Sequence, residues 1–254
     1  MTEADDTTVF FGRVHPERAN VNIRLPLIHV GFSREGLLKA SVQVDLSQFT
    51  ARVSGALDED LFTERNGIGS VAQLFVDVLG LTNGCGYTVE IVGCNRNGGT
   101  TIFGCDVPAL AGDPPQAPAD FQGIASLLLA DGEGRLFPLR RALGDFRRAI
   151  LEPDDTPFHC YRSVEALTYY FGKNPRQGRP KMCAALRIDN NWIRRELEIP
   201  AGEIRHGKLV TMTGDDRVRA LVGARSVLVR FIEFVSLGLD GLPEDGFPVI
   251  PRVK

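Results

Sequence analysis

The chain has 254 residues, 43% of them hydrophobic and 24% charged, and this composition is typical of a globular protein with a substantial core. It excludes an intrinsically disordered chain, and no run of about 18 apolar residues, the length needed to cross a bilayer, is present. The net charge of −3 hides an asymmetry, because residues 1–130 carry 8 basic and 15 acidic residues, whereas residues 131–235 carry 19 and 14. Two units are therefore expected, of which only the second would attract a polyanion.

The N-terminal segment indicates the cellular compartment, and the cysteines and histidines indicate whether a metal or cofactor is bound. The segment Met1–Thr8 is acidic where a signal peptide would be basic and then apolar, so a cytoplasmic protein without membrane contact is expected. The five cysteines are scattered without C-x-x-C spacing, which favours free thiols over a zinc or redox site. No histidine recurs at the spacing of metal ligands, and no glycine motif for phosphate or dinucleotide binding is present. The sequence therefore predicts no metal and no cofactor.

The first half of the chain is rich in short runs of valine, isoleucine and phenylalanine, each bounded by turn-forming residues, which is typical of β-strands. We expect strands over Thr7–Val14, Asn20–Val30, Lys39–Leu46, Phe49–Gly55, Tyr87–Cys94 and Thr100–Val107, with a hairpin turn at Asn95–Gly99. Between Leu61 and Leu81 the apolar residues, Val78 among them, recur at helical spacing instead, and Gly80 together with the following Thr82–Gly86 is expected to stop that helix. The prediction for residues 1–112 is a small antiparallel sheet packed on one helix, an α+β unit.

The rest of the chain is expected to be mainly helical. Residues 113–120 are dense in proline and polar side chains and are interpreted as a linker. We expect helices over Pro138–Leu151, Asp154–Gly172 and Thr213–Leu237, one or two short helices around Trp192 within Pro180–Ile199, and an apolar segment of undecided period at Phe121–Ala130. Residues 121–237 therefore predict a helical bundle, followed over 238–254 by an irregular tail that is too rich in glycine and proline for a helix.

The group Arg205-His206-Gly207 stands between two of these helical patterns and is the first candidate site. A histidine can act as general acid or base near neutral pH, while an arginine holds a phosphate oxygen through its forked donors. Cleavage of RNA by attack of its own 2′-hydroxyl needs only a general acid or base and a group that holds the phosphate. In a structural interpretation, Arg205 and His206 instead cap the carbonyls of a helix end and Gly207 allows the turn. The sequence leaves both interpretations open.

Arg162 and Glu165 form the second candidate pair. They stand three residues apart on one predicted helix, among residues that are expected to be buried. A charge inside a bundle must be paired, because an isolated one costs several kcal/mol. The pair is interpreted either as a structural ion pair that fixes the register of the helix, or as a group in which one side chain reaches and positions His206.

Two long segments carry a resemblance to a known group. The helical half, with "LGDFRRAILEPDDTPFHCYRSVEALTYYF" and then "IRHGK" before a long last helix, resembles the helical domain of a group of uncharacterised bacterial proteins. The general design of that domain is similar to the HEPN (higher eukaryote and prokaryote nucleotide-binding) superfamily. The segment "LFTERNGIGSVAQLFVDVLGLTNGCGYTVEI" resembles the N-terminal part of the same group. The resemblance implies a four-helix bundle that forms a homodimer and, in active members, an RNase of toxin, abortive-infection or antiviral systems.

One departure from the pattern of active HEPN members bears on catalysis. Those members carry an arginine four to six residues before the histidine, whereas Gly202, Ala201 and Pro200 occupy these positions before His206. Only the adjacent Arg205, or Arg194 and Arg195 further upstream, could substitute. The resemblance therefore implies a HEPN-like protein without a complete catalytic motif.

Three functions are expected from these observations. The first is a protein that binds RNA, a nucleotide or a partner protein in bacterial stress or antiviral defence, with Arg194, Arg195 and Lys208 as nucleic-acid contacts. The second is a metal-independent RNase that uses His206 with Arg205, supported by Arg162 and Glu165. The third is a structural subunit that docks onto other proteins through its acidic sheet domain.

Overall fold

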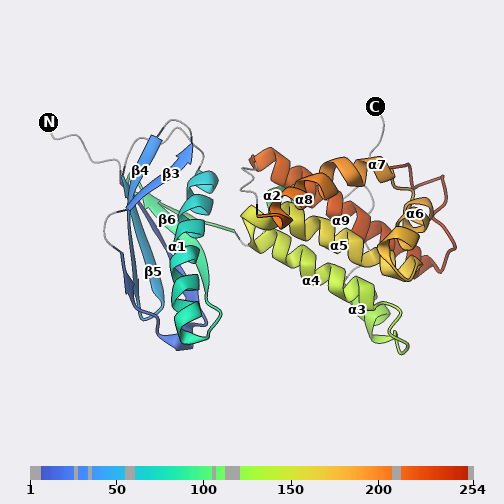
Figure 1. Cartoon of the computed structure of the whole chain (residues 1–254), viewed down its shortest axis with the longest axis horizontal. Helices are drawn as coiled ribbons and strands as arrows, with labels where there is room; N and C mark the ends of the chain where they lie inside the picture. The colour runs from blue at the N-terminus through green and yellow to red at the C-terminus, as the bar shows by residue number, and fades with distance from the viewer. Residues whose placement is uncertain are drawn as a thin grey trace. The chain divides into compact units, whose positions relative to one another are not determined.

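The computed structural model describes residues 7–25, 28–33, 36–54, 61–104, 107–111, 121–207 and 213–250. It confirms the predicted α+β class, because an antiparallel sheet with one long helix is followed by a helical region (Figure 1). The chain divides into two compact units, Met1–Cys105 and Asp106–Lys254. The linker predicted at 113–120 lies outside the described residues. None of the described helices is long and apolar enough to cross a membrane.

The first unit is built on a seven-stranded sheet in which every described pairing is antiparallel. Along the sheet the strands follow the order β2-β4-β5-β1-β6-β7, and β3 also pairs with β4. The strands are β1 (Thr7–His15), β2 (Ile23–Arg24), β3 (Ile28–Ser33), β4 (Gly36–Asp45), β5 (Gln48–Ser54), β6 (Thr88–Arg96) and β7 (Gly99–Ile102). The single strand predicted over Asn20–Val30 is wrong, because β2 and β3 are separate strands.

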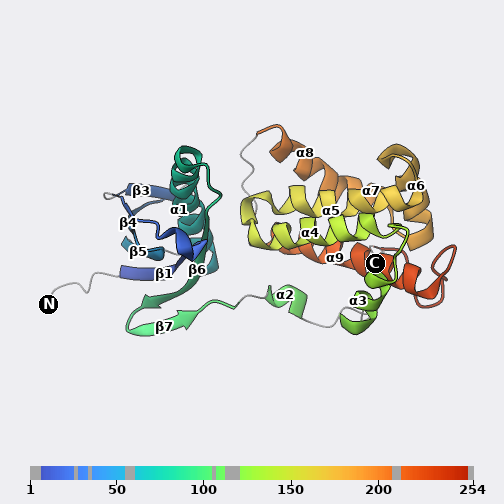
Figure 2. The same cartoon turned by 90° about the horizontal axis from the view of Figure 1, so that it is seen from below.

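Helix α1 (Leu61–Asn83) covers one face of the sheet (Figure 1 and Figure 2). Its buried residues Ile68, Ala72 and Val76 pack into one core with Phe10 and the other inward-facing residues of the strands. Val78, predicted to belong to the buried face, is 56% exposed.

Helix α1 ends within its predicted stop, which comprised Gly80 and Thr82–Gly86. The helix continues to Asn83, and Gly80 lies against the turn that follows it, where a Cβ atom would come within 2.4 Å of the carbonyl oxygen of Cys85. This glycine is therefore required for a close approach of two backbone segments rather than for a turn.

The second unit is helical throughout its core. Its helices are α2 (Pro108–Ala111), α3 (Phe121–Leu129), α4 (Phe137–Leu151), α5 (Thr156–Phe171), α6 (Pro175–Leu186), α7 (Asn190–Ile193), α8 (Ile199–Arg205) and α9 (Gly214–Leu237), with a 3-10 turn η2 (Pro153–Asp155) and a π-helical segment η3 (Arg194–Glu198). Helix α5 is central and packs against α4, α6, α8 and α9, and α4 and α5 run side by side in both views (Figure 1 and Figure 2).

The helix boundaries follow from local capping. Thr213 and Asp216 form a capping box at the start of α9, as the predicted start at Thr213 requires. Helix α6 begins before the segment Pro180–Ile199 in which short helices were expected, because the Asn174 side chain accepts a hydrogen bond from the Gln177 N–H at 3.0 Å and fixes the first turn. The predicted anchor Trp192 packs so closely on α9 that a Cβ atom on Gly223 would come within 2.6 Å of its ring.

The predicted irregular tail, as far as residue 250, packs on the bundle. Buried Arg230 of α9 donates hydrogen bonds to the carbonyls of Leu186 and Arg187, at 2.9 and 2.8 Å, and to that of Pro248. Leu242 is buried in the core of the helical unit. The tail therefore closes one side of this core.

Candidate functional site

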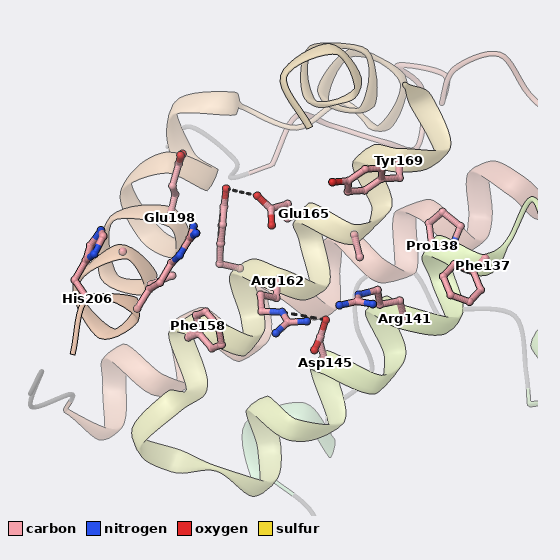
Figure 3. A pocket seen from close by; sticks show the side chains of 15 residues that line it. Phe137, Pro138, Arg141, Asp145, Phe158, Arg162, Glu165, Tyr169, Glu198 and His206 are labelled. Atoms are coloured by element: carbon pink, nitrogen blue, oxygen red, sulfur yellow. Dashed lines mark hydrogen bonds and ion pairs between the residues drawn. The ribbon is translucent and has the colours of Figure 1, made fainter. Parts of the chain in front are cut away.

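A pocket of about 810 Å³ opens in the helical unit between α4, α5 and the η3–α8 segment (Figure 3). Its lining includes all four residues predicted to be catalytic, which are Arg162, Glu165, Arg205 and His206. Arg162 and Glu165 come from α5, whereas Arg205 and His206 come from the end of α8. The fold thus brings together two candidate groups that lie about forty residues apart in the sequence. Their chemical roles stay predictions.

The end of α8 explains the positions of Arg205 and His206. The helix closes through its backbone, because the His206 N–H donates to the Gly202 carbonyl at 3.2 Å and the Gly207 N–H donates to the Ile204 carbonyl at 2.9 Å. Gly207 has a φ of 75°, which glycine adopts without strain. The side chains of Arg205 and His206 are exposed and make no hydrogen bond or ion pair with any described residue. Gly207 therefore allows the turn, and neither side chain is held by another described residue.

The predicted ion pair between Arg162 and Glu165 is not formed. The Arg162 Nε atom lies 3.5 Å from Asp145 Oδ2 on α4, and the Arg162 guanidinium also lies over the ring of Phe158. The Glu165 Oε1 atom instead accepts a hydrogen bond of 3.0 Å from the Tyr161 hydroxyl. The two candidates separate because α4 packs on α5 and brings a buried carboxylate to Arg162 (Figure 3).

The charged side chains of the pocket include two arginines that no described carboxylate pairs with. Glu198 pairs with Arg179 at 2.7 Å, and Asp145 and Glu165 have the partners described above. Burial and then Glu165 raise the pKa of Tyr161 well above its usual range, so its hydroxyl stays protonated and donates. Arg141 and Arg205 make no hydrogen bond or ion pair within the part of the chain that the structure describes. Each of these three carboxylates thus has a cation or a hydrogen-bond donor beside it, whereas two guanidinium groups have no partner among the described residues.

Arg194 and Arg195, the two predicted nucleic-acid contacts that the structure describes, do not line the main pocket. Arg194 lines a second, more open pocket of about 530 Å³, which shares Glu198, Gly202 and His206 with the first. Arg195 is exposed on η3 and lines neither pocket. Lys208 lies outside the described residues. His206 therefore lines both pockets, and of the two described contacts Arg194 alone lines a pocket with it.

Sequence reasoning missed Arg141, Asp145 and His159. Asp145 is 4% exposed and falls on the buried stripe of α4 with Leu139, Ala142 and Ala149, so a carboxylate at a core position was the signal that could have found it. Behind it lies His159, 6% exposed, with Nδ1 4.0 Å from Asp145 Oδ1 and Nε2 2.8 Å from Glu152 Oε2. With Glu152 and Asp155, this histidine is a group of described residues that could hold a metal ion.

Comparison with known proteins identifies a family for both units. Residues 8–103 match the family model described as "Domain of unknown function (DUF8168) N-terminal domain", and residues 125–236 match the model of its C-terminal domain. No curated protein and no solved structure matches the chain. The two matches lie in the order that their names require, and each falls within one structural unit. The chain therefore belongs to the DUF8168 family, with the N-terminal domain in the sheet unit and the C-terminal domain in the helical unit.

Proposed function

We propose that the helical unit binds a nucleotide, free or as part of single-stranded RNA, in the pocket between α4, α5 and α8. The observation that carries the proposal is that Arg141 and Arg205 line this pocket without a partner among the described residues, while its carboxylates are paired. A planar guanidinium matches the oxygens of a phosphate with two parallel hydrogen bonds. Two such groups on the wall of one pocket would bind a phosphorylated ligand.

The aromatic lining would hold the base. Phe137 and Tyr169 line the same pocket and are 63% and 54% exposed, which is unusual for large apolar rings in a folded domain. Stacking of a base on an exposed ring is worth about 1–3 kcal/mol and tolerates any base. The volume of about 810 Å³ lies within the range of about 300–1,000 Å³ that is usual for small-molecule pockets.

A HEPN-like protein of bacterial stress or antiviral defence is the wider form of this proposal. His206 and Gly207 close the helix before the long last helix α9, which matches the His-Gly position implied by the resemblance. Active HEPN members have an arginine where this chain has Pro200–Gly202, and its absence favours binding over full catalysis. The proposal includes a homodimer formed through the helical unit.

The test is binding of two labelled probes, a fluorescent adenosine monophosphate and a fluorescent single-stranded oligoribonucleotide, followed by anisotropy at low salt. Arg141→Ala and Arg205→Ala should each weaken binding by about 10- to 100-fold, because a charge-assisted hydrogen bond contributes about 1.5–3 kcal/mol. Arg147→Ala is the matched control, since Arg147 is an exposed arginine of α4 outside the pocket. Binding of the oligonucleotide alone would assign RNA as the source of the nucleotide.

Two outcomes would reject the pocket. If neither probe binds at low salt, the nucleotide proposal is wrong. If Arg147→Ala, Arg194→Ala and Arg195→Ala weaken binding as much as Arg141→Ala does, the ligand follows surface charge rather than the pocket. For the oligonucleotide, the slope of log affinity against log salt changes by about 0.7 for each phosphate that a variant no longer neutralises.

A metal-independent RNase is the second candidate. The observation that favours it is that His206 and Arg205 line the pocket together and that the His206 side chain has no hydrogen bond with a described residue. His206 would take the proton of a 2′-hydroxyl, whose oxygen then attacks the adjacent phosphorus, forming a cyclic phosphate and releasing the 5′-oxygen, which takes a proton from water. Arg205 would hold a phosphate oxygen. Cleavage in EDTA should be lost in His206→Ala with an unchanged circular dichroism spectrum. Equal recovery of intact RNA with wild type and variant would reject catalysis.

A further inference from the structure

A second group of ligating side chains lies at the turn between α4 and α5. Glu152 follows the last residue of α4, Asp155 ends the η2 turn, and His159 lies one turn into α5. Each offers one ligand atom, and these three atoms all lie within 4.8 Å of one another. Glu152 Oε2 and His159 Nε2 lie 2.8 Å apart in a hydrogen bond. Two ligands of a tetrahedral Zn²⁺ ion lie about 3.3 Å apart, so an ion would replace this bond after a small outward shift of the two side chains. The spacing Glu-x-x-Asp-x-x-x-His brings all three to one side of the turn.

Asp155 does not perform the structural role of its position. It is the N-cap residue of α5, where an aspartate usually accepts a hydrogen bond from the first turn, but its side chain makes no such bond. Its carboxylate has no hydrogen bond or ion pair with any residue that the structure describes. A carboxylate that neither caps its helix nor pairs with a described cation, and that lies beside a histidine and a second carboxylate, is better explained by a ligand than by helix stability.

The buried side of the histidine gives an independent observation. The His159 side chain is 7% exposed, and its Nδ1 atom is buried without a hydrogen-bond partner, facing Asp145 Oδ1 at 4.0 Å. Asp145 is also buried, and its Oδ2 atom lacks a hydrogen bond. A histidine that binds a metal through Nε2 carries its proton on Nδ1 and donates it to a carboxylate. Metal binding would thus give Nδ1 a proton directed at Asp145, whereas the tautomer protonated at Nε2 turns a lone pair toward a carboxylate.

The turn is held in place by hydrogen bonds outside the group. The Thr156 hydroxyl donates to the Ala149 carbonyl at 2.8 Å, and Arg217 of α9 donates to the Thr156 hydroxyl at 3.1 Å and to the Ile150 carbonyl at 2.8 Å. These bonds fix the end of α4 against the start of α5. The three ligating residues are therefore presented by a rigid turn, which lowers the entropic cost of binding an ion.

We propose that Glu152, Asp155 and His159 form a divalent transition-metal site, with Zn²⁺ as its ion and Asp145 as the carboxylate that orients His159. One imidazole and two carboxylates suit Zn²⁺, whereas Mg²⁺ and Ca²⁺ prefer all-oxygen sets. Three protein ligands leave a fourth position of the tetrahedron for water. The site does not depend on nucleotide binding in the pocket, with which it shares Asp145 alone.

The test is calorimetric titration of the metal-free full chain with Zn²⁺ and, separately, with Mg²⁺, together with thermal unfolding in each metal. We expect one Zn²⁺ site, a rise in Tm with Zn²⁺, and no comparable effect of Mg²⁺. Asp155→Asn and Glu152→Gln should each weaken Zn²⁺ binding at least tenfold. Asp145→Asn should weaken it about 10- to 100-fold, the usual effect of removing the carboxylate behind a histidine ligand.

Asp154→Asn is the matched control, because Asp154 is the neighbouring carboxylate and is not in the group. Its Zn²⁺ affinity should equal that of wild type. Because Glu152 is exposed and the Asp155 side chain makes no capping bond, their variants are expected to fold, and Tm in EDTA verifies this. Equal Zn²⁺ affinity in wild type, Asp155→Asn and Glu152→Gln would overturn the proposal, as would the absence of Zn²⁺ binding.

Discussion

Replacing Asp145 by asparagine should lower the free energy of unfolding of the helical unit. The carboxylate is 4% exposed and lies 3.5 Å from Arg162 Nε and 4.0 Å from His159 Nδ1. Removing one partner of a fully buried ion pair costs about 3–5 kcal/mol. The Arg162 side chain is 29% exposed and can turn toward water, and the amide keeps the shape of the carboxylate. We therefore expect a smaller loss of about 1–3 kcal/mol.

Urea unfolding followed by tryptophan fluorescence measures the unfolding of the helical unit, in which Asp145 lies. Trp192 is the single tryptophan of the chain, and it packs on Gly223 of α9. Glu133→Gln is the matched control, because Glu133 forms an ion pair of 2.9 Å with Arg135 in which both side chains are at least 75% exposed. Its effect should stay below about 1 kcal/mol.

A double-mutant cycle of Asp145→Asn with Arg162→Gln separates the pair from other effects. It should give a coupling of about 1 kcal/mol or more. Asp145→Asn within about 0.5 kcal/mol of wild type, or a cycle without coupling, would refute the reasoning that this buried carboxylate holds Arg162.

Three further predictions concern packing, pH and thiol reactivity. In Gly178→Ala, the new Cβ atom would come within 1.9 Å of the Thr168 carbonyl oxygen, so α5 and α6 must separate. The free energy of unfolding should fall by about 1–3 kcal/mol in the tryptophan assay. Gly144→Ala is the control, because its Cβ atom would meet nothing within 4 Å and should cost no stability. Because burial raises the pKa of Asp155 in the folded chain, its contribution to stability is present below the unfolded pKa of about 3.9 and is lost as pH rises through the folded value. Asp155→Asn should therefore raise Tm at pH 7 in EDTA and give no gain below about pH 4, and a lower Tm at pH 7 would contradict the sign. Burial raises the pKa of Cys160 to about 12, so a thiol reagent at pH 8 should label the partly exposed Cys85 before Cys160, as peptide mass spectrometry of the folded protein would show.

The fold class could be predicted because the periodicities are strong. Alternating residues in the strands and the helical spacing of α1, α4, α5 and α9 are local signals, and the structure agrees with them. The errors concern single elements. Val78 was expected on the buried face of α1, but it is 56% exposed. Short helices were expected within Pro180–Ile199, but Asn174 caps α6 before that segment.

The candidate site was only half predictable. Residue types and their helical context indicated Arg205, His206, Arg162 and Glu165, and the structure brings all four to one pocket. The partner of Arg162 could not be inferred, because it depends on which face of α4 packs on α5. The group of Glu152, Asp155 and His159 was missed because metal ligands were expected as recurring histidines. A single histidine with two carboxylates over one turn gives no such repeat.

The two proposals meet at Asp145. Its carboxylate stands between His159, which we assign to the metal group, and Arg162, which lines the pocket. An ion on His159 Nε2 would place a proton on Nδ1 and draw Asp145 Oδ1 toward it, which changes the position of Oδ2 against Arg162. If ion binding alters the nucleotide affinity of the pocket through this carboxylate, the nucleotide must alter the ion affinity by the same factor, because the coupling free energy between two sites is reciprocal. Asparagine at position 145 removes the charge that both neighbours share, so it should abolish that coupling in both directions.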